Sequence, residues 1–143
     1  MVSIKGRHVY LDANTVIYAL EGMPQYTNLK TGLLDPLDFG EFTAVTSQLT
    51  LLEAIVFPRR NGNVAAEETF RAFLTPSASL AVQGISLAVL EKTIELRAQF
   101  PALKTPDAIH LATGILAKCD LFVTRDAGWA KVGVAVVSPM DIV

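Results

Sequence analysis

Apolar and polar positions alternate along the chain with two periods, one typical of strands and the other of helices. Short apolar or β-branched runs predict strands at residues 8–11, 42–46, 80–85, 121–124 and 134–137. Apolar residues three or four positions apart predict helices at residues 14–20, 47–57, 64–74, 86–100 and 105–119. Because strands alternate with helices, the predicted fold class is α/β, a three-layer α/β/α sandwich with a central, mainly parallel sheet.

Prolines and glycines interrupt this pattern. Residues 21–41 contain several of them and have no sustained period, although 26–34 has the spacing of a short helix. We interpret 21–41 as a mobile loop with some helix. Pro58 is expected to end the helix before it, because proline cannot donate the backbone hydrogen bond that a helix interior requires.

The composition is that of a folded protein. The sequence has 143 residues, of which 51% are hydrophobic and 18% are charged. This length is common for one domain, and this balance favours a well-filled core over disorder. We therefore expect a single domain over residues 1–143. The net charge of −2 excludes a strongly basic protein, so any site for nucleic acid must be local.

The chain has no signal for export or for a membrane. Its apolar runs fall well short of the roughly 20 residues needed to cross a bilayer. Residues 1–7 are polar and basic, and no cleavage-type segment follows them. Cys119 is the only cysteine, which leaves no disulfide framework or thiolate metal site and fits a reducing compartment. We expect a cytoplasmic protein in which Cys119 is a small buried apolar residue.

Two acidic residues stand where predicted strands end. Asp12 follows the first strand in V-Y-L-D-A-N-T, and Asp126 follows the strand at 121–124 in F-V-T-R-D-A-G-W. In parallel α/β sheets, functional groups collect at the carboxyl ends of the strands. Asp12 and Asp126 are therefore expected at the same edge of the sheet, although each could also be an ordinary cap or turn residue.

Two further acids lie on predicted helices. Thr105 can cap its helix and Pro106 suits the first position, so Asp107 falls in the first turn, where the helix dipole favours its charge. That explanation is purely structural. Glu53, in T-L-L-E-A-I, has apolar neighbours, and its carboxylate needs a partner unless it is solvated.

Four such carboxylates suit a hard divalent cation. Carboxylates that lie close together repel one another and cannot all remain ionised without a counter-charge. Mg²⁺ or Mn²⁺ would supply it, and a water activated by the ion would attack a phosphodiester in line. Asp12, Asp107 and Asp126 are expected to hold the ion directly or through water. Glu53 is either a further ligand or the group that orients and deprotonates the attacking water.

The local motifs resemble those of the PIN-domain ribonucleases, in particular the VapC-type toxins of toxin–antitoxin pairs. They are T-P-D-A-I-H-L-A-T at 105–113, L-D-A-N-T at 11–15, L-L-E-A at 51–54 and F-V-T-R-D at 122–126. By this similarity Asp12, Glu53 and Asp107 match the family's core acids, and Asp126 matches the fourth. The resemblance implies a PIN-like fold, metal-dependent endoribonuclease activity, a cognate antitoxin and a homodimer.

The comparison with that family also singles out residues beside the acids. Some members carry another acid a few residues after the fourth, whereas this chain has Gly128 and Trp129, so one bound ion is expected. Asn14 and Thr124 match the small polar residues beside the family's acids, and we interpret them as supporting residues that orient the acids by hydrogen bonds. The alternatives are an asparagine cap and a β-branched strand end.

Basic residues near the acids are candidate contacts for RNA phosphates. The candidates are Arg125, Lys131, Arg59 and Arg60. Each of them could instead be a solvated surface charge. No interleaved aromatic and basic pattern is visible, so RNA would be held mainly through its backbone. His110 lies three residues after Asp107, but hard cations prefer oxygen, so we expect it to pack or to form hydrogen bonds.

Two other functions compete with the nuclease. A phosphatase with Asp12 as nucleophile would need a second acid two residues later, where this chain has Asn14, so that hypothesis is disfavoured. The main alternative is a catalytically weak PIN-like scaffold that binds RNA or protein. Metal titration separates it from the nuclease, because only the nuclease requires the ion.

Overall fold

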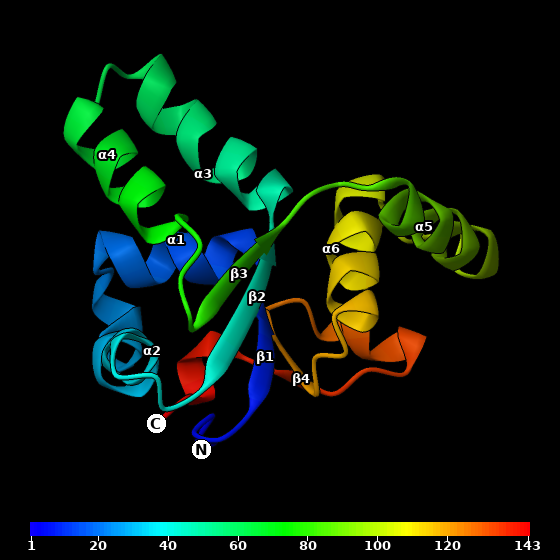
Figure 1. Cartoon of the computed structure of the whole chain (residues 1–143), viewed down its shortest axis with the longest axis horizontal. Helices are drawn as coiled ribbons and strands as arrows, with labels where there is room; N and C mark the ends of the chain where they lie inside the picture. Colours follow the sequence, from blue (N-terminus) through cyan, green and yellow to red (C-terminus); the bar gives the residue numbers. More distant parts are fainter.

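The computed structural model describes all of residues 1–143, and its centre is a five-stranded sheet (Figure 1). The strands are β1 (His8–Leu11), β2 (Thr43–Ser47), β3 (Leu80–Gln83), β4 (Leu121–Val123) and β5 (Val136–Val137). They lie in the order β3-β2-β1-β4-β5, and every neighbouring pair is parallel. The predicted α/β class with a parallel sheet is confirmed.

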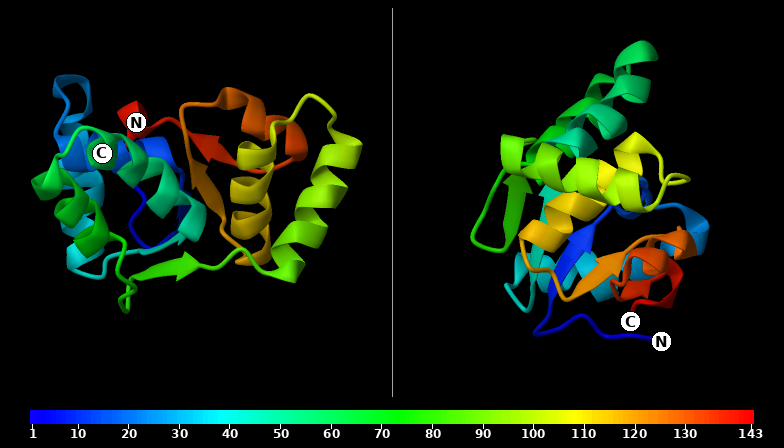
Figure 2. Two further views of the ribbon diagram at one scale, coloured as in Figure 1. Left: turned by 90° about the horizontal axis from the view of Figure 1, so that it is seen from above. Right: turned by 90° about the vertical axis from the view of Figure 1, so that its right-hand side faces the viewer.

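Helices cover both faces of the sheet. They are α1 (Ala13–Glu21), α2 (Asp35–Asp38), α3 (Gln48–Arg60), α4 (Val64–Phe73), α5 (Leu87–Gln99) and α6 (Thr105–Leu116). Three short 3₁₀ helices, η1 (Pro24–Tyr26), η3 (Ala127–Val132) and η4 (Pro139–Asp141), and a π-helix, η2 (Lys30–Leu34), complete the set. Figure 1 shows α3 and α4 as a projecting arm, with α5 and α6 on the other side of the strands. Figure 2 shows the same arrangement from two further directions, and the three predicted layers are present.

Alternation along β1 explains how the layers are joined. Val9 and Leu11 pack in the apolar cluster under α1, whereas Tyr10 packs in the cluster under α5 and α6. Successive side chains of a strand point to opposite faces, so a central strand that is apolar throughout must be covered on both. Gly114 lets α6 approach the sheet, because a Cβ at this position would collide with the ring of Phe122.

Residues 21–41 are mostly helical. η1, η2 and α2 occupy most of the segment, and Leu29, Leu33 and Leu37 are buried in the core. The prediction of a mobile loop with some helix was therefore wrong about the loop. Leucines four positions apart form an apolar helical stripe, and the prolines and glycines between them hid this period.

Two helix ends also differ from the prediction. α3 continues through Pro58 to Arg60. Pro58 is buried in the last turn of the helix, where the contacts of its ring offset the loss of one backbone hydrogen bond. α6 ends before Lys118, which adopts a left-handed φ of 60°.

Cys119 is half-buried, and burial raises the pKa of its thiol to about 12.

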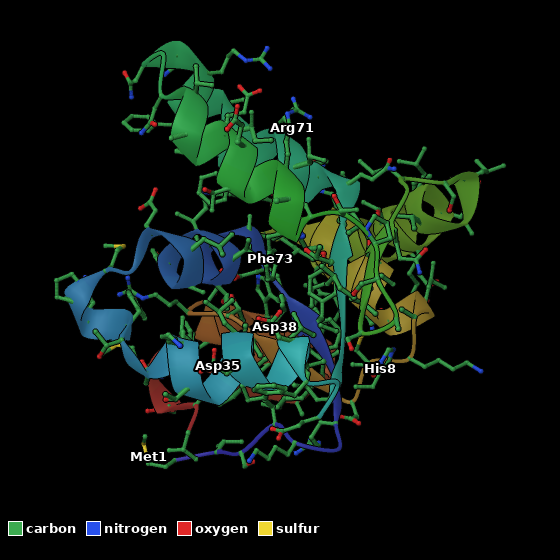
Figure 3. The ribbon with its side chains drawn as sticks, turned by 60° about the vertical axis from the view of Figure 1, so that its left-hand side comes forward. Met1, His8, Asp35, Asp38, Arg71 and Phe73 are labelled. Atoms are coloured by element: carbon green, nitrogen blue, oxygen red, sulfur yellow. The ribbon has the colours of Figure 1, made fainter.

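The direction of the strands determines which edge of the sheet can carry a site. In Figure 3, His8, the first residue of β1, lies on the lower side of the view, as does Met1, whereas Arg71 of α4 lies on the upper side. The carboxyl ends of β1 and β2 lead into α1 and α3 at that upper side. No helix of the structure combines the length and apolarity that crossing a membrane requires.

Candidate metal-binding active site

Asp12 lies where β1 ends and α1 begins. It is buried, and its Oδ1 accepts a 2.8 Å hydrogen bond from the backbone N–H of Thr15, which caps α1. The Thr15 hydroxyl donates to the carbonyl of Val123 in β4 at 3.2 Å. The cap considered as an alternative role is thus present, but it uses only one carboxylate oxygen and leaves Oδ2 available.

Glu53 projects from α3 toward α6, where it meets His110. Nε2 of His110 lies 2.5 Å from Oε1 of Glu53, and Nδ1 of His110 lies 2.6 Å from the hydroxyl of Tyr10. The side chain of His110 is 4% exposed and that of Glu53 is 33% exposed. His110 is therefore the partner that Glu53 required, and the hydrogen-bonding role predicted for His110 is confirmed.

Asp107 lies in the first turn of α6 as predicted. Its pKa is raised, first by burial and then by the negative charge of Asp126, while Glu53 adds to the rise and His110 opposes it. The negative charge of the neighbouring carboxylates, which adds to the effect of burial, favours the binding of a cation.

The start of α6 differs from the prediction in one respect. Lys104 occupies the cap position and offers no side-chain hydrogen bond, whereas Thr105 is already the first helical residue. The prediction that Thr105 caps the helix was wrong. Because no side chain caps α6, its first N–H groups remain open to the negative charge of Asp107 and its neighbours.

Asp126 follows β4 and begins the turn η3. Its backbone N–H donates to Oγ1 of Thr124 at 3.1 Å, and its Oδ1 accepts from the backbone N–H of Gly128 at 2.9 Å. Thr124 thus contacts the backbone of Asp126, and its supporting role stays a prediction. Asn14 is exposed near the acids, and its side chain forms no hydrogen bond within the chain.

The four acids open onto two neighbouring hollows. The first, of about 400 Å³, is lined by Asp12, Asn14, Glu53, Asp107, His110 and Trp129, together with apolar residues of α1 and α3. The second, of about 360 Å³, is lined by Asp12, Asn14, Tyr18, Asp107, Thr124, Arg125, Asp126 and Trp129. Asp12 and Asp107 border both. No three candidate ligands come together at metal-binding distances in this structure, so the acids share a depression without forming a closed ligand cluster.

Trp129 lines both hollows. It is 2% exposed, and its indole N–H has no hydrogen-bond partner of acceptable geometry, although it is close enough to lower the pKa of Asp107. A buried donor without a partner is costly, so it marks a place where an acceptor can bind. The four acids that share this depression offer the hard oxygen donors that Mg²⁺ or Mn²⁺ prefers.

The basic candidates divide into two groups. Arg125 lines the second hollow, and its guanidinium lies 6.0 Å from the ring centre of Tyr18, which stacks on Tyr26 at 4.3 Å. Lys131 lines a third hollow of about 460 Å³ that reaches Asp107 and Asp126. By contrast, the other two candidates line none of these three hollows. They are Arg59, which is paired with Glu67, and Arg60, which is exposed.

Two residues near the acids escaped the sequence analysis. Tyr18 follows Asn14 by four positions, a helical spacing that could have placed both beside Asp12. Together, Tyr18 and Arg125 form the aromatic and basic pair that the linear sequence did not reveal. Lys104 lines the third hollow beside Lys131, and only the fold brings these two lysines together.

Comparison with known proteins agrees with this geometry. A family model described as the PIN domain matches residues 9–135. The chain belongs to the PIN-domain family. Solved structures that are similar to this PIN domain also confirm the predicted resemblance to VapC-type toxins. No curated protein sequence matches it.

The similar structures come from toxin–antitoxin systems. A toxin–antitoxin complex from Klebsiella pneumoniae is 25% identical, with a TM-score of 0.69, and the match covers 92% of this chain and 97% of that one. VapC20 of Mycobacterium tuberculosis, described as a sarcin–ricin loop cleaving toxin, is 18% identical with a TM-score of 0.67 over 92% and 99% of the two chains. VapBC2 from Rickettsia felis, bound to a DNA fragment of its promoter, is 16% identical with a TM-score of 0.70 over 92% and 98%.

Proposed function

We propose that this PIN domain is a divalent-metal-dependent endoribonuclease and the toxin of a toxin–antitoxin pair. The observation that carries the proposal is the position of Asp12, Glu53, Asp107 and Asp126 around adjoining hollows at the carboxyl edge of the sheet. No serine or cysteine lines the two hollows beside these acids. Activation of water is the chemistry that these carboxylates suit.

Asp12, Asp107 and Asp126 are the residues that would hold Mg²⁺ or Mn²⁺, with Glu53 as a further ligand or as the base. Such an ion supplies charge to the reacting phosphate and makes water easier to deprotonate. Asp12 would contribute the oxygen that its helix cap leaves free, and Glu53 the oxygen that His110 does not engage. Because the extra family acid is absent here, we propose one ion rather than two.

RNA is the proposed substrate. Arg125 lines one hollow beside the acids together with Tyr18, and Lys104 and Lys131 line another. A single strand could cross the acids with phosphates at these cations and a base near the Tyr18 ring. The description of VapC20 as a sarcin–ricin loop cleaving toxin supports the same substrate class.

A cognate antitoxin is the proposed protein partner, and a homodimer is the proposed assembly. The Klebsiella pneumoniae relative is a toxin–antitoxin complex, which supports the antitoxin. Large apolar side chains stand exposed on α3 and α5 of this chain. They are Leu52, Val56, Phe57, Leu87, Leu90 and Ile94. Patches of this kind are typical of surfaces that other chains cover.

The test is cleavage of a panel of cellular RNAs by the purified protein. Endonucleolytic products are expected with Mg²⁺ or Mn²⁺, and EDTA in excess of the ion should abolish them. A protein that binds RNA with or without the ion but never cuts it would overturn the nuclease and favour the scaffold. Cleavage that persists in EDTA would overturn the role of the metal.

A further inference from the structure

A buried chain of hydrogen bonds connects the central strand to Glu53. Tyr10 lies in the middle of β1 and is fully buried, and its hydroxyl contacts Nδ1 of His110 at 2.6 Å. On the other side of the imidazole, Nε2 contacts Oε1 of Glu53 at 2.5 Å. Tyr10 and His110 are not among the acids assigned to the proposed reaction, so this contact needs its own explanation.

The direction of these hydrogen bonds follows from the chemistry of the three groups. Burial raises the pKa of Tyr10 well above its ordinary value, so its hydroxyl keeps its proton. A bare Nε2 would place its lone pair against the carboxylate of Glu53, which is repulsive at this distance. Nε2 therefore carries a proton and donates to Glu53. If the imidazole is neutral, Nδ1 is then an acceptor for the Tyr10 hydroxyl.

Packing holds the imidazole in this orientation. The His110 ring lies edge-on to Tyr10, with centroids 5.8 Å apart, and stacks with Trp129 at 6.2 Å. Glu53 has no comparable support, because its neighbours on α3, Leu52 and Val56, are 59% and 45% exposed. A glutamate on such a surface would otherwise rotate among several side-chain conformers. His110 is its only hydrogen-bond partner within the chain.

We propose that Tyr10 and His110 are positioning residues that hold Glu53 by Oε1 and leave Oε2 directed to the hollow beside Asp12 and Asp107. Tyr10 sets the proton position on His110, and His110 orients the carboxylate. The hydrogen-bond arrangement stands on the contacts alone. Its kinetic consequence rests on the proposed nuclease function, in which Glu53 acts on water or on the ion.

The arrangement can be tested in the metal-free protein by ¹⁵N NMR of the imidazole nitrogens. The chain has two histidines, so a His8→Gln variant leaves only the signals of His110. Nε2 is expected to be protonated, and Tyr10→Phe should shift the Nδ1 resonance of His110 by removing its partner. An Nδ1-protonated ring with a bare Nε2, or an Nδ1 resonance indifferent to Tyr10→Phe, would overturn the proposal.

The kinetic test is a double-mutant cycle between Tyr10→Phe and Glu53→Gln, measured on RNA with Mg²⁺. Tyr10→Phe should lower kcat about 10-fold and leave KM unchanged, because it loosens Glu53 without touching RNA. In the Glu53→Gln background it should have no further effect. An equal loss in both backgrounds would mean a general effect on packing and would overturn the positioning role.

The matched control is Thr93→Val. Thr93 is buried in α5, and its hydroxyl donates only to the carbonyl of Val89 in the same helix. The Thr93→Val variant therefore loses a buried hydroxyl, as Tyr10→Phe does, but keeps the hydrogen bonds that connect Tyr10 to Glu53. Its kcat should match that of the wild type. If the wild type cuts no RNA, the nuclease proposal fails, while the NMR result still decides whether His110 orients Glu53.

Discussion

Two groups of carboxylates in this PIN domain are built in opposite ways. On the α3–α4 arm, Glu67 accepts hydrogen bonds from Arg59 at 2.6 and 2.7 Å and from Arg71 at 3.1 Å. These cations lower the pKa of Glu67 to about 2. At the candidate site, Asp107 lies near Asp126 and Glu53 without any arginine or lysine ion pair, and its pKa is raised. One carboxylate is satisfied by the chain, and the other is not.

The difference shows what distinguishes a structural acid from a candidate functional one. Two arginines neutralise the charge of Glu67, so its carboxylate needs no ligand as a counter-charge. The acids at the edge of the sheet instead keep free oxygens, a shared negative charge and the unpaired N–H of Trp129 beside them. Perturbed, under-compensated groups that line a hollow are the usual mark of a binding or catalytic site.

The largest expected effect is on RNA cleavage. Glu53→Gln keeps the shape of the side chain but removes its charge, so it should reduce cleavage by at least about 10²-fold if Glu53 aids water activation. Glu67→Gln, the same substitution on the arm, should cut RNA at the wild-type rate. Gel-based cleavage assays on both variants measure the contrast, and undiminished cutting by Glu53→Gln would refute its role.

The next effect is on metal affinity. Asp12→Ala and Asp107→Ala should each weaken Mg²⁺ or Mn²⁺ binding by about 10-fold or more, because a hard cation loses an anionic oxygen ligand. Calorimetric titration or the fluorescence of Trp129, the only tryptophan, reports the binding. Asp35→Ala is the control, since Asp35 is paired with Lys30 on the surface. Wild-type affinity in both site variants, with circular dichroism unchanged, would contradict the proposed ligands.

The sequence predicted some parts of the molecule better than others. Apolar periods gave the order of strands and helices, and strand ends placed Asp12 and Asp126 at one edge of the sheet. The helical structure of residues 21–41 was not predicted, because their glycines and prolines indicate only local backbone preferences. The burial of the leucines in the core determines the fold of this segment. The contact between Glu53 and His110 joins residues 57 positions apart, so only the tertiary structure reveals it.

A smaller effect concerns substrate binding. Lys131→Ala and Arg125→Ala should raise KM for RNA by about 3- to 10-fold and reduce the salt dependence of binding by about one unit of slope each. Arg60→Ala should change neither, because Arg60 lines none of the hollows beside the acids. Salt titrations of RNA binding in EDTA test this without cleavage. An equal loss in all three variants would move the RNA path toward the α3–α4 arm.

The smallest effect is on stability, and here the two regions should respond to pH with opposite signs. Asp107 has a raised pKa in the folded state, so the native chain binds more protons there than the unfolded chain does. Stability therefore falls as pH rises from the ordinary pKa of an aspartate to the raised one. Glu67 has its pKa lowered from 4.5 to about 2, so its contribution is present above that range and is lost on acidification. At pH 7 without metal, Asp107→Asn should leave Tm unchanged or raise it by about 2 °C, whereas Glu67→Gln should lower it slightly. Calorimetric melting between about pH 3 and pH 7, a range that covers the titration of carboxyl groups, measures both changes in Tm. A loss of several degrees in Asp107→Asn would mean that its charge serves the start of α6 rather than a cation.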